Sequence, residues 1–182
     1  MSKITVIVGS IRRESINRKL AQALTKLAPG SQFSFARLDD LPLFNQDLEA
    51  NMPAPVARFK KEIEEADALL IVTPEYNRSI PGVLKNAIDW ASRPYGKSSF
   101  PGKPTAIIGT SSGQVGTAAA QQHLRSVLVN QDTALLGQPE AYIQFTPGLI
   151  DDAGNITNEA TKKLLQGFMD KFAGWIARVG SK

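Results

Sequence analysis

Three polar loops contain most of the side chains that could do chemistry in this sequence. The first loop, residues 9–17, leads into a predicted helix whose free N–H groups and positive dipole end favour an anion. Arginine adds forked donors that match phosphate oxygens. The loop therefore predicts a phosphate site; the alternative is that Ser15 only caps the helix and the arginines are solvated, and for Arg13 both interpretations stay open. The polar side chains concerned are Ser10, Arg12, Arg13, Ser15 and Asn17.

The second loop follows the most apolar run of the chain, residues 68–72, which is typical of a strand buried on both faces of a parallel sheet. Pro74 ends that strand because it lacks an N–H group. Residues 75–80 are polar apart from Tyr76 and Ile80, and Pro81-Gly82 then open a helix. A third polar loop, residues 110–116, follows another buried strand. None of the three is a dinucleotide G-x-G-x-x-G or a Walker P-loop, so these fingerprints are missing.

The apolar spacing around these loops predicts strands that alternate with helices. Such alternation indicates a parallel sheet with right-handed crossovers. We therefore expect a flavodoxin-like, doubly wound α/β fold with five parallel strands in the order 2-1-3-4-5 and helices on both faces, and all three loops at one edge. Strands are expected at residues 4–8, 32–37, 68–72, 105–109 and 132–137, with 141–145 as a further extended segment; helices at 16–27, 55–66, 82–91, 120–128 and 164–179.

Composition limits the function classes. The 182 residues suit one domain, 1–182, and the absence of cysteine excludes disulfides and Cys-ligated metal centres. The net charge of +4 is dispersed, which argues against nucleic acid and favours anionic small molecules. Neither a signal-peptide core nor a run of membrane-spanning length is present, so we expect a cytoplasmic protein with no membrane partner. His123 is the only histidine, which excludes a multi-histidine metal site and favours a structural or surface role.

Two motifs, G-S-I-R-R-E-S-I-N-R-K-L-A from Gly9 and T-P-E-Y-N-R-S-I-P-G-V-L-K-N-A-I-D-W from Thr73, resemble the NADPH-dependent FMN reductase family. The resemblance covers residues 4 to about 145, and the family includes bacterial chromate, quinone and azo-dye reductases. It implies a flavodoxin-like enzyme that binds FMN non-covalently and forms homodimers or homotetramers.

The resemblance also implies site residues. The FMN phosphate would be held by the first loop, the isoalloxazine and ribityl chain by the second, largely through backbone groups, and the other side of the flavin by the third. A flavin ring needs a flat, partly apolar slot with a few polar groups, and Tyr76 could border it. The implied cofactor-binding residues are Ser10, Arg12, Ser15, Ile16, Asn17, Pro74, Glu75, Tyr76, Asn77, Ser79, Ser111, Ser112 and Gly113.

The implied reaction is ping-pong hydride transfer from NAD(P)H through flavin N5 to quinones, azo compounds, free flavin or chromate. It requires no protein acid or base, so no catalytic residue and no metal ligand is assigned. Tyr76 and Arg93 are the candidate substrate contacts, although Arg93 could equally be an exposed loop arginine. In chromate-reductase relatives a tyrosine, an arginine and a glutamate link protomers, and Tyr76, Arg125 and Glu140 match those positions; ordinary surface charges are the alternative for the last two.

Two other function classes remain open. A flavodoxin-type electron carrier would bind FMN without oxidising NAD(P)H. Its phosphate loop lacks arginines and its charge is usually acidic, so Arg12, Arg13 and the pI near 9.4 argue against it. A flavin-sensing module is the third, and the sequence offers no extra segment that supports it.

Overall fold

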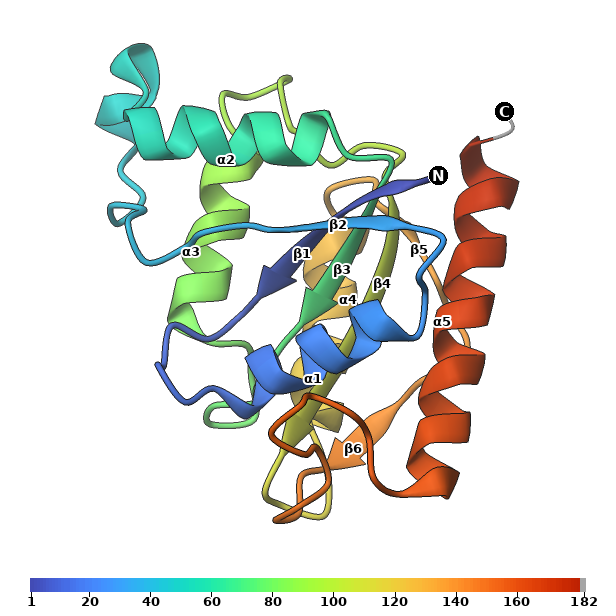
Figure 1. The fold of residues 1–182 in the computed structure, drawn as a ribbon. Coiled ribbons are helices and arrows are strands. Elements are labelled where there is room, and N and C mark those ends of the chain that lie inside the picture. The colour runs from blue at the N-terminus through green and yellow to red at the C-terminus, as the bar shows by residue number, and fades with distance from the viewer. Residues whose placement is uncertain (181–182) are drawn as a thin grey trace.

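The computed structural model describes residues 1–180, which form a six-stranded parallel sheet with α-helices on both faces (Figure 1). The strand order β2-β1-β3-β4-β5 confirms the predicted flavodoxin-like arrangement. The strands are β1 (Lys3–Val8), β2 (Gln32–Phe35), β3 (Ala68–Val72), β4 (Pro104–Ser111), β5 (Ala134–Leu135) and β6 (Tyr142–Gln144). The helices are α1 (Ile16–Lys26), the 3-10 helix η1 (Gln46–Asn51), α2 (Ala54–Glu64), α3 (Gly82–Ala91), α4 (Ala118–Val129) and α5 (Glu159–Gly180).

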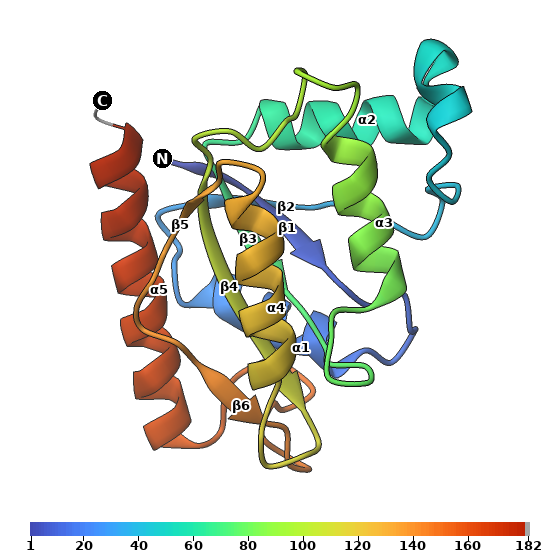
Figure 2. The same cartoon turned by 180° about the vertical axis from the view of Figure 1, so that it is seen from behind.

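At the β4 edge two short strands share the fifth position: β5 falls in the predicted strand 132–137, and β6 in the further extended segment 141–145. β5 pairs with the start of β4 through Pro104 and Thr105, and β6 pairs with its end, from Gly109 to Ser111. Between them the chain runs through Gly137 and Pro139, and a proline cannot donate to a strand ladder. The chain therefore leaves the sheet after β5 and returns as β6 (Figure 2).

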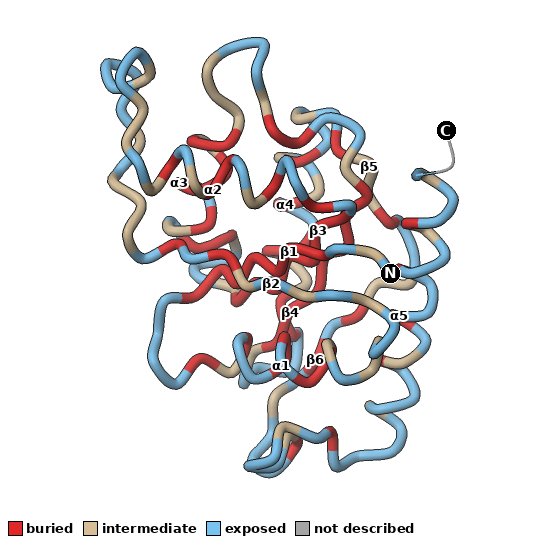
Figure 3. The backbone as a smooth tube through the Cα atoms, turned by 45° about the horizontal axis from the view of Figure 1, so that its top comes forward, coloured by how far each residue is buried: buried red, intermediate tan, exposed pale blue. Residues whose placement is uncertain are grey.

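Alternating strand residues divide the buried side chains into two hydrophobic cores. In β3, Leu70 and Val72 pack with α1 and α5 on one face, whereas Leu69 and Ile71 pack with α2, α3 and α4 on the other. Every residue of β3 is buried, as expected for a central parallel strand, and the buried segments gather in the middle of the molecule (Figure 3).

The last helix, α5, carries an apolar stripe at helical spacing that covers the sheet. Leu165, Phe168 and Phe172 are buried in the core of that face. Leu164 was predicted to belong to the same stripe, but it is 46% exposed because it lies one position, or about 100° of helix rotation, away from Leu165. No helix in residues 1–180 is long and apolar enough to cross a membrane.

Candidate functional site

The candidate site lies where β1, β3 and β4 end level with one another. Val8 is paired with Val72, and Val72 with Ile108, so the three following loops start side by side. They enclose a cavity of about 150 Å³. Its lining residues are Ser10, Arg12, Ser15, Ile16, Asn17, Pro74, Glu75, Tyr76, Thr110, Ser111 and Ser112. Ten of these eleven were predicted, and the structure brings them together from three separated loops.

The first loop presents donors suited to an anion. Ser15 is the N-cap of α1, where its side chain accepts a hydrogen bond from the N–H group of Arg18 at 3.3 Å. Its hydroxyl hydrogen remains able to donate, and the first N–H groups of a helix have no partner within it. The first turn of α1 contains no acidic residue, and the exposed Arg12 adds a cation at the cavity. This set of donors fits a phosphate group.

Asn17 has a different geometry from the one expected of a phosphate ligand. Its side chain is buried, and its Nδ2 donates to the carbonyl oxygen of Thr110 at 2.9 Å while its Oδ1 accepts from the Thr110 N–H at 3.0 Å. Asn17 also lines the cavity, and its amide keeps one further hydrogen that can donate. The main role of Asn17 is therefore to join the start of α1 to the end of β4.

The second loop contains a tight turn from Tyr76 to Ser79. The N–H and carbonyl groups of these two residues exchange hydrogen bonds of 3.0 Å, and Asn77 and Arg78 between them have φ angles of 52° and 63°. Positive φ at both central residues is the mark of a type I′ turn. The turn holds the half-exposed Tyr76 ring at the cavity.

The helix α4 supports this turn. Glu75 Oε2 accepts a hydrogen bond from the N–H group of Ala120 at 3.1 Å, in the first turn of α4, where the N-cap residue makes no side-chain capping bond. Ser79 Oγ lies 2.6 Å from His123 Nδ1. The sequence prediction did not assign His123 to the site, and no local pattern could reveal this contact, because 44 positions separate the two residues.

The third loop is braced from within and from β6. Ser111 Oγ donates to the carbonyl oxygen of Gly116, and Gln144 Nε2 donates to that of Ser112 at 3.2 Å. Thr110 lines the cavity but was not among the predicted site residues. Its position directly after the apolar part of the strand was the sequence signal that could have identified it as a site residue.

Three predicted cofactor-binding residues do not line the cavity. Asn77 is at the exposed tip of the turn, Ser79 faces His123, and Gly113 is exposed beside Ser111. All three belong to the loops that line the cavity, so they border it without contributing to its wall.

Arg93, predicted as a substrate contact, lies at the other end of α3 from the cavity. The ten residues of that helix span about 15 Å. Arg93 Nη1 lies 3.6 Å from Glu49 Oε1 on η1, and its guanidinium carbon is 5.7 Å from the centre of the Phe44 ring. The structure therefore does not bring Arg93 to the cavity of its own chain; it ties η1 to the end of α3.

Arg125 and Glu140, predicted to contact another protomer, contact each other. Arg125 Nε lies 3.6 Å from Glu140 Oε1, and its Nη1 donates to the carbonyl oxygen of Leu136 at 2.9 Å. Hydrogen bonds from Tyr142 and Gln122 lower the pKa of Glu140 below its usual value. The cluster lies on the α4 and β6 side of the molecule.

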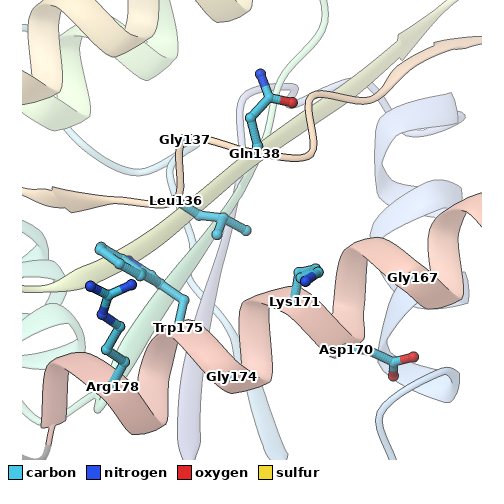
Figure 4. A pocket seen from close by; sticks show the side chains of 9 residues that line it. All are labelled: Leu136, Gly137, Gln138, Gly167, Asp170, Lys171, Gly174, Trp175 and Arg178. Atoms are coloured by element: carbon cyan, nitrogen blue, oxygen red, sulfur yellow. The ribbon is translucent and has the colours of Figure 1, made fainter.

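A larger cavity, about 730 Å³, lies between α5 and the β5–β6 connection, away from all predicted site residues (Figure 4). It is shallow, with Gly167 and Gly174 on α5 and Gly137 on the connection. Trp175 and Arg178 stand at one end of it, and Lys171 lies further along α5. Its size alone does not make it the functional site, because ligands of open α/β sheets bind at the carboxyl ends of the strands, where the smaller cavity lies.

Comparison with known proteins gives a consistent result. The family model described as NADPH-dependent FMN reductase matches residues 2–147. The 2-hydroxy-1,4-benzoquinone reductase of Burkholderia sp is 56% identical over 175 residues, which are 96% of each chain. The quinone reductase of Escherichia coli (strain K12) is 37% identical over 97% of this chain and 96% of its own.

Among solved structures, the flavoenzyme NAD(P)H:(acceptor) oxidoreductase FerB from Paracoccus denitrificans superposes with a TM-score of 0.95, at 49% identity over 98% of both chains. The chain therefore belongs to the NADPH-dependent FMN reductase family, and this confirms the predicted reductase with FMN as cofactor and NAD(P)H as co-substrate.

Proposed function

We propose that this protein is an FMN-dependent quinone reductase that takes electrons from NAD(P)H and passes them to a quinone in a ping-pong scheme. The observation that carries the proposal is the cavity in which an anion-binding helix start meets an aromatic-bearing turn and a hydroxyl-bearing loop. The names of the relatives from Burkholderia and Escherichia coli support a quinone as the acceptor.

The overall reaction balances as NAD(P)H, one proton and a quinone giving NAD(P)⁺ and a hydroquinone. FMN, when bound, supplies a centre that accepts a hydride and then returns two electrons. Because Tyr76 lines the cavity and is also 47% exposed, the cavity reaches the surface beside this ring. Donor and acceptor would use this opening in turn, which is the basis of the ping-pong scheme. Azo compounds, free flavin and chromate are further proposed acceptors.

The chain's own residues would bind and orient the cofactor. Ser10, Arg12 and Ser15 would hold its phosphate, because they combine hydroxyl donors and a cation at the start of α1. The backbone around Pro74 and Tyr76 would hold the ring from one side. The proposed wall is completed by Ile16, Asn17, Glu75, Ser111 and Ser112, with Asn77, Ser79 and Gly113 at its border.

The visible spectrum of the purified protein, followed by anaerobic addition of NADPH and then of a quinone, tests the proposal. We expect flavin absorption that bleaches with NADPH and returns with the quinone. A flavin spectrum that NADPH leaves unchanged would instead identify an electron carrier. A protein that neither carries nor binds FMN would refute both functions.

We further propose a homodimer or homotetramer in which Tyr76, Arg125 and Glu140 contribute to protomer contacts. The half-exposed Tyr76 ring leaves apolar surface available for a partner. Light scattering of wild type and Arg125→Ala tests this, and an unchanged mass would remove Arg125 from the proposed interface. A cytoplasmic location is also proposed, because NAD(P)H is available there; cell fractionation tests it.

A further inference from the structure

The turn that carries Tyr76 has an unfavourable backbone. Asn77 and Arg78 both have positive φ angles, 52° and 63°. Asparagine adopts this left-handed conformation more readily than most residues, but arginine has no such preference. A turn of this kind in an exposed loop needs contacts from elsewhere to hold one conformation.

Those contacts come from one face of α4. Ala120 and His123 are three positions apart, so they lie next to each other on the helix surface. The N–H group of Ala120 donates to Glu75 Oε2 at 3.1 Å, just before the turn, and His123 Nδ1 lies 2.6 Å from Ser79 Oγ at its end. Tyr76 is therefore located between two points that α4 holds in place.

Burial distinguishes the two contacts. Ala120 is buried and its bond to Glu75 involves the backbone, so it belongs to the packing of α4. His123 is exposed, and its only described hydrogen bond is the one to Ser79. An exposed histidine adds little to core packing, so the main effect of its side chain falls on the turn.

We infer that His123 is a positioning residue for the flavin-binding site: through Ser79 it fixes the turn that places Tyr76 at the cavity. The inference rests on the proposed binding of FMN, and it adds to that site a residue from α4 that touches neither cofactor nor substrate. It also separates two parts of the site, since the turn would hold the ring and the first loop the phosphate.

This separation predicts a specific pattern of affinities. His123→Ala removes one hydrogen bond from the turn, and such a bond contributes enough to change the dissociation constant by about two- to tenfold. Because only the ring-binding side is affected, the dissociation constants of FMN and of riboflavin, which lacks the phosphate, increase by the same factor. A purely structural role would change the unfolding midpoint and leave both constants as they are.

The experiment measures both constants by flavin fluorescence quenching with the full-length apoprotein. Ser79→Ala removes the same hydrogen bond by deleting its other partner. The double variant should therefore bind flavin no more weakly than either single variant. His123→Asn offers an amide oxygen near the position of Nδ1 and should restore most of the affinity. Ser126→Ala, at an exposed position one turn further along α4, is the matched control and should bind like wild type.

The outcomes are distinguishable. The inference is supported if His123→Ala and Ser79→Ala each lose affinity for FMN and for riboflavin by the same factor, and if His123→Asn recovers most of that affinity. Wild-type affinities in both alanine variants, or a loss confined to FMN, overturn it while the proposed function stands. If His123→Ala does not fold, Ser79→Ala alone decides. A wild-type protein that binds no FMN refutes the proposed function, and this inference with it.

Discussion

Asn17 and Thr110, 93 positions apart, form a closed pair of hydrogen bonds in the buried wall of the candidate site. The Asn17 side chain donates to the Thr110 carbonyl oxygen at 2.9 Å and accepts from the Thr110 N–H at 3.0 Å. A side-chain amide here takes the place of a strand and binds Thr110 in addition to its pairing with β6. It gives β4 a partner at the point where the chain turns towards the third loop, and it fixes the start of α1 against that strand.

Replacing this amide should destabilise the protein markedly. Asn17→Ala leaves the N–H and carbonyl groups of Thr110 buried without their Asn17 partners, and each such group costs about 1–3 kcal/mol, so we expect a loss of about 2–6 kcal/mol. Urea unfolding of the apoprotein measures it. Gln22→Ala, at an exposed position of the same helix, is the control. A midpoint for Asn17→Ala equal to that of wild type would contradict the assigned role.

The two adjacent arginines of the first loop should differ in their effect on cofactor affinity. Arg12 lines the cavity, whereas Arg13 is exposed and does not. Arg12→Ala should weaken FMN binding by about tenfold, because a hydrogen bond to a charged group is lost, and should leave riboflavin binding nearly unchanged. Arg13→Ala is the matched control. Equal losses in the two variants would show that the loop acts only through its overall charge.

Gly109 should tolerate no side chain. A Cβ atom there would lie 2.0 Å from the Thr73 carbonyl oxygen and 2.3 Å from Thr117 Oγ1, where β4 passes the start of the second loop. We expect Gly109→Ala to destabilise the fold by about 3 kcal/mol or more. Gly82→Ala, where an added Cβ meets no atom within 4 Å, should be neutral or slightly stabilising. Thermal unfolding compares the two variants, and similar melting temperatures would refute the assigned close approach.

The stability of the protein should depend on pH through Glu140. Hydrogen bonds from Tyr142 and Gln122 lower the pKa of this carboxyl in the folded state below its ordinary value of 4.5. Its contribution is therefore fully present above pH 4.5 and is lost as the pH falls through the lower, folded-state value. Glu140→Gln should be less stable than wild type at neutral pH, and the difference should shrink on acidification.

Urea unfolding at several pH values measures this difference. Glu65→Gln, which removes a largely exposed carboxylate, is the control. A gap between wild type and Glu140→Gln that stays constant or widens towards acid pH would show that the pair of hydrogen bonds does not favour the charged form.

Local patterns were sufficient for the elements and for the place of the site. The buried strand Ala68–Val72 was predicted with its correct bounds, because an all-apolar run followed by Pro74 has few other conformations. The three polar loops were predicted to meet, because consecutive parallel strands end at one edge of a sheet. Ten predicted residues accordingly line the cavity.

The tertiary structure decided which atoms these residues use. Asn17 binds Thr110, Glu75 caps α4, Ser79 faces His123, and Arg93 pairs with Glu49. The tertiary structure also decided that β5 and β6 share the fifth position of the sheet. The sequence by itself determined the central strands, the five α-helices and the edge where the polar loops converge, because periodicity and turn residues act over a few positions. Which polar groups pair was decided only by the folded chain, because hydrogen-bond partners 44 to 93 positions apart depend on how helices pack on the sheet.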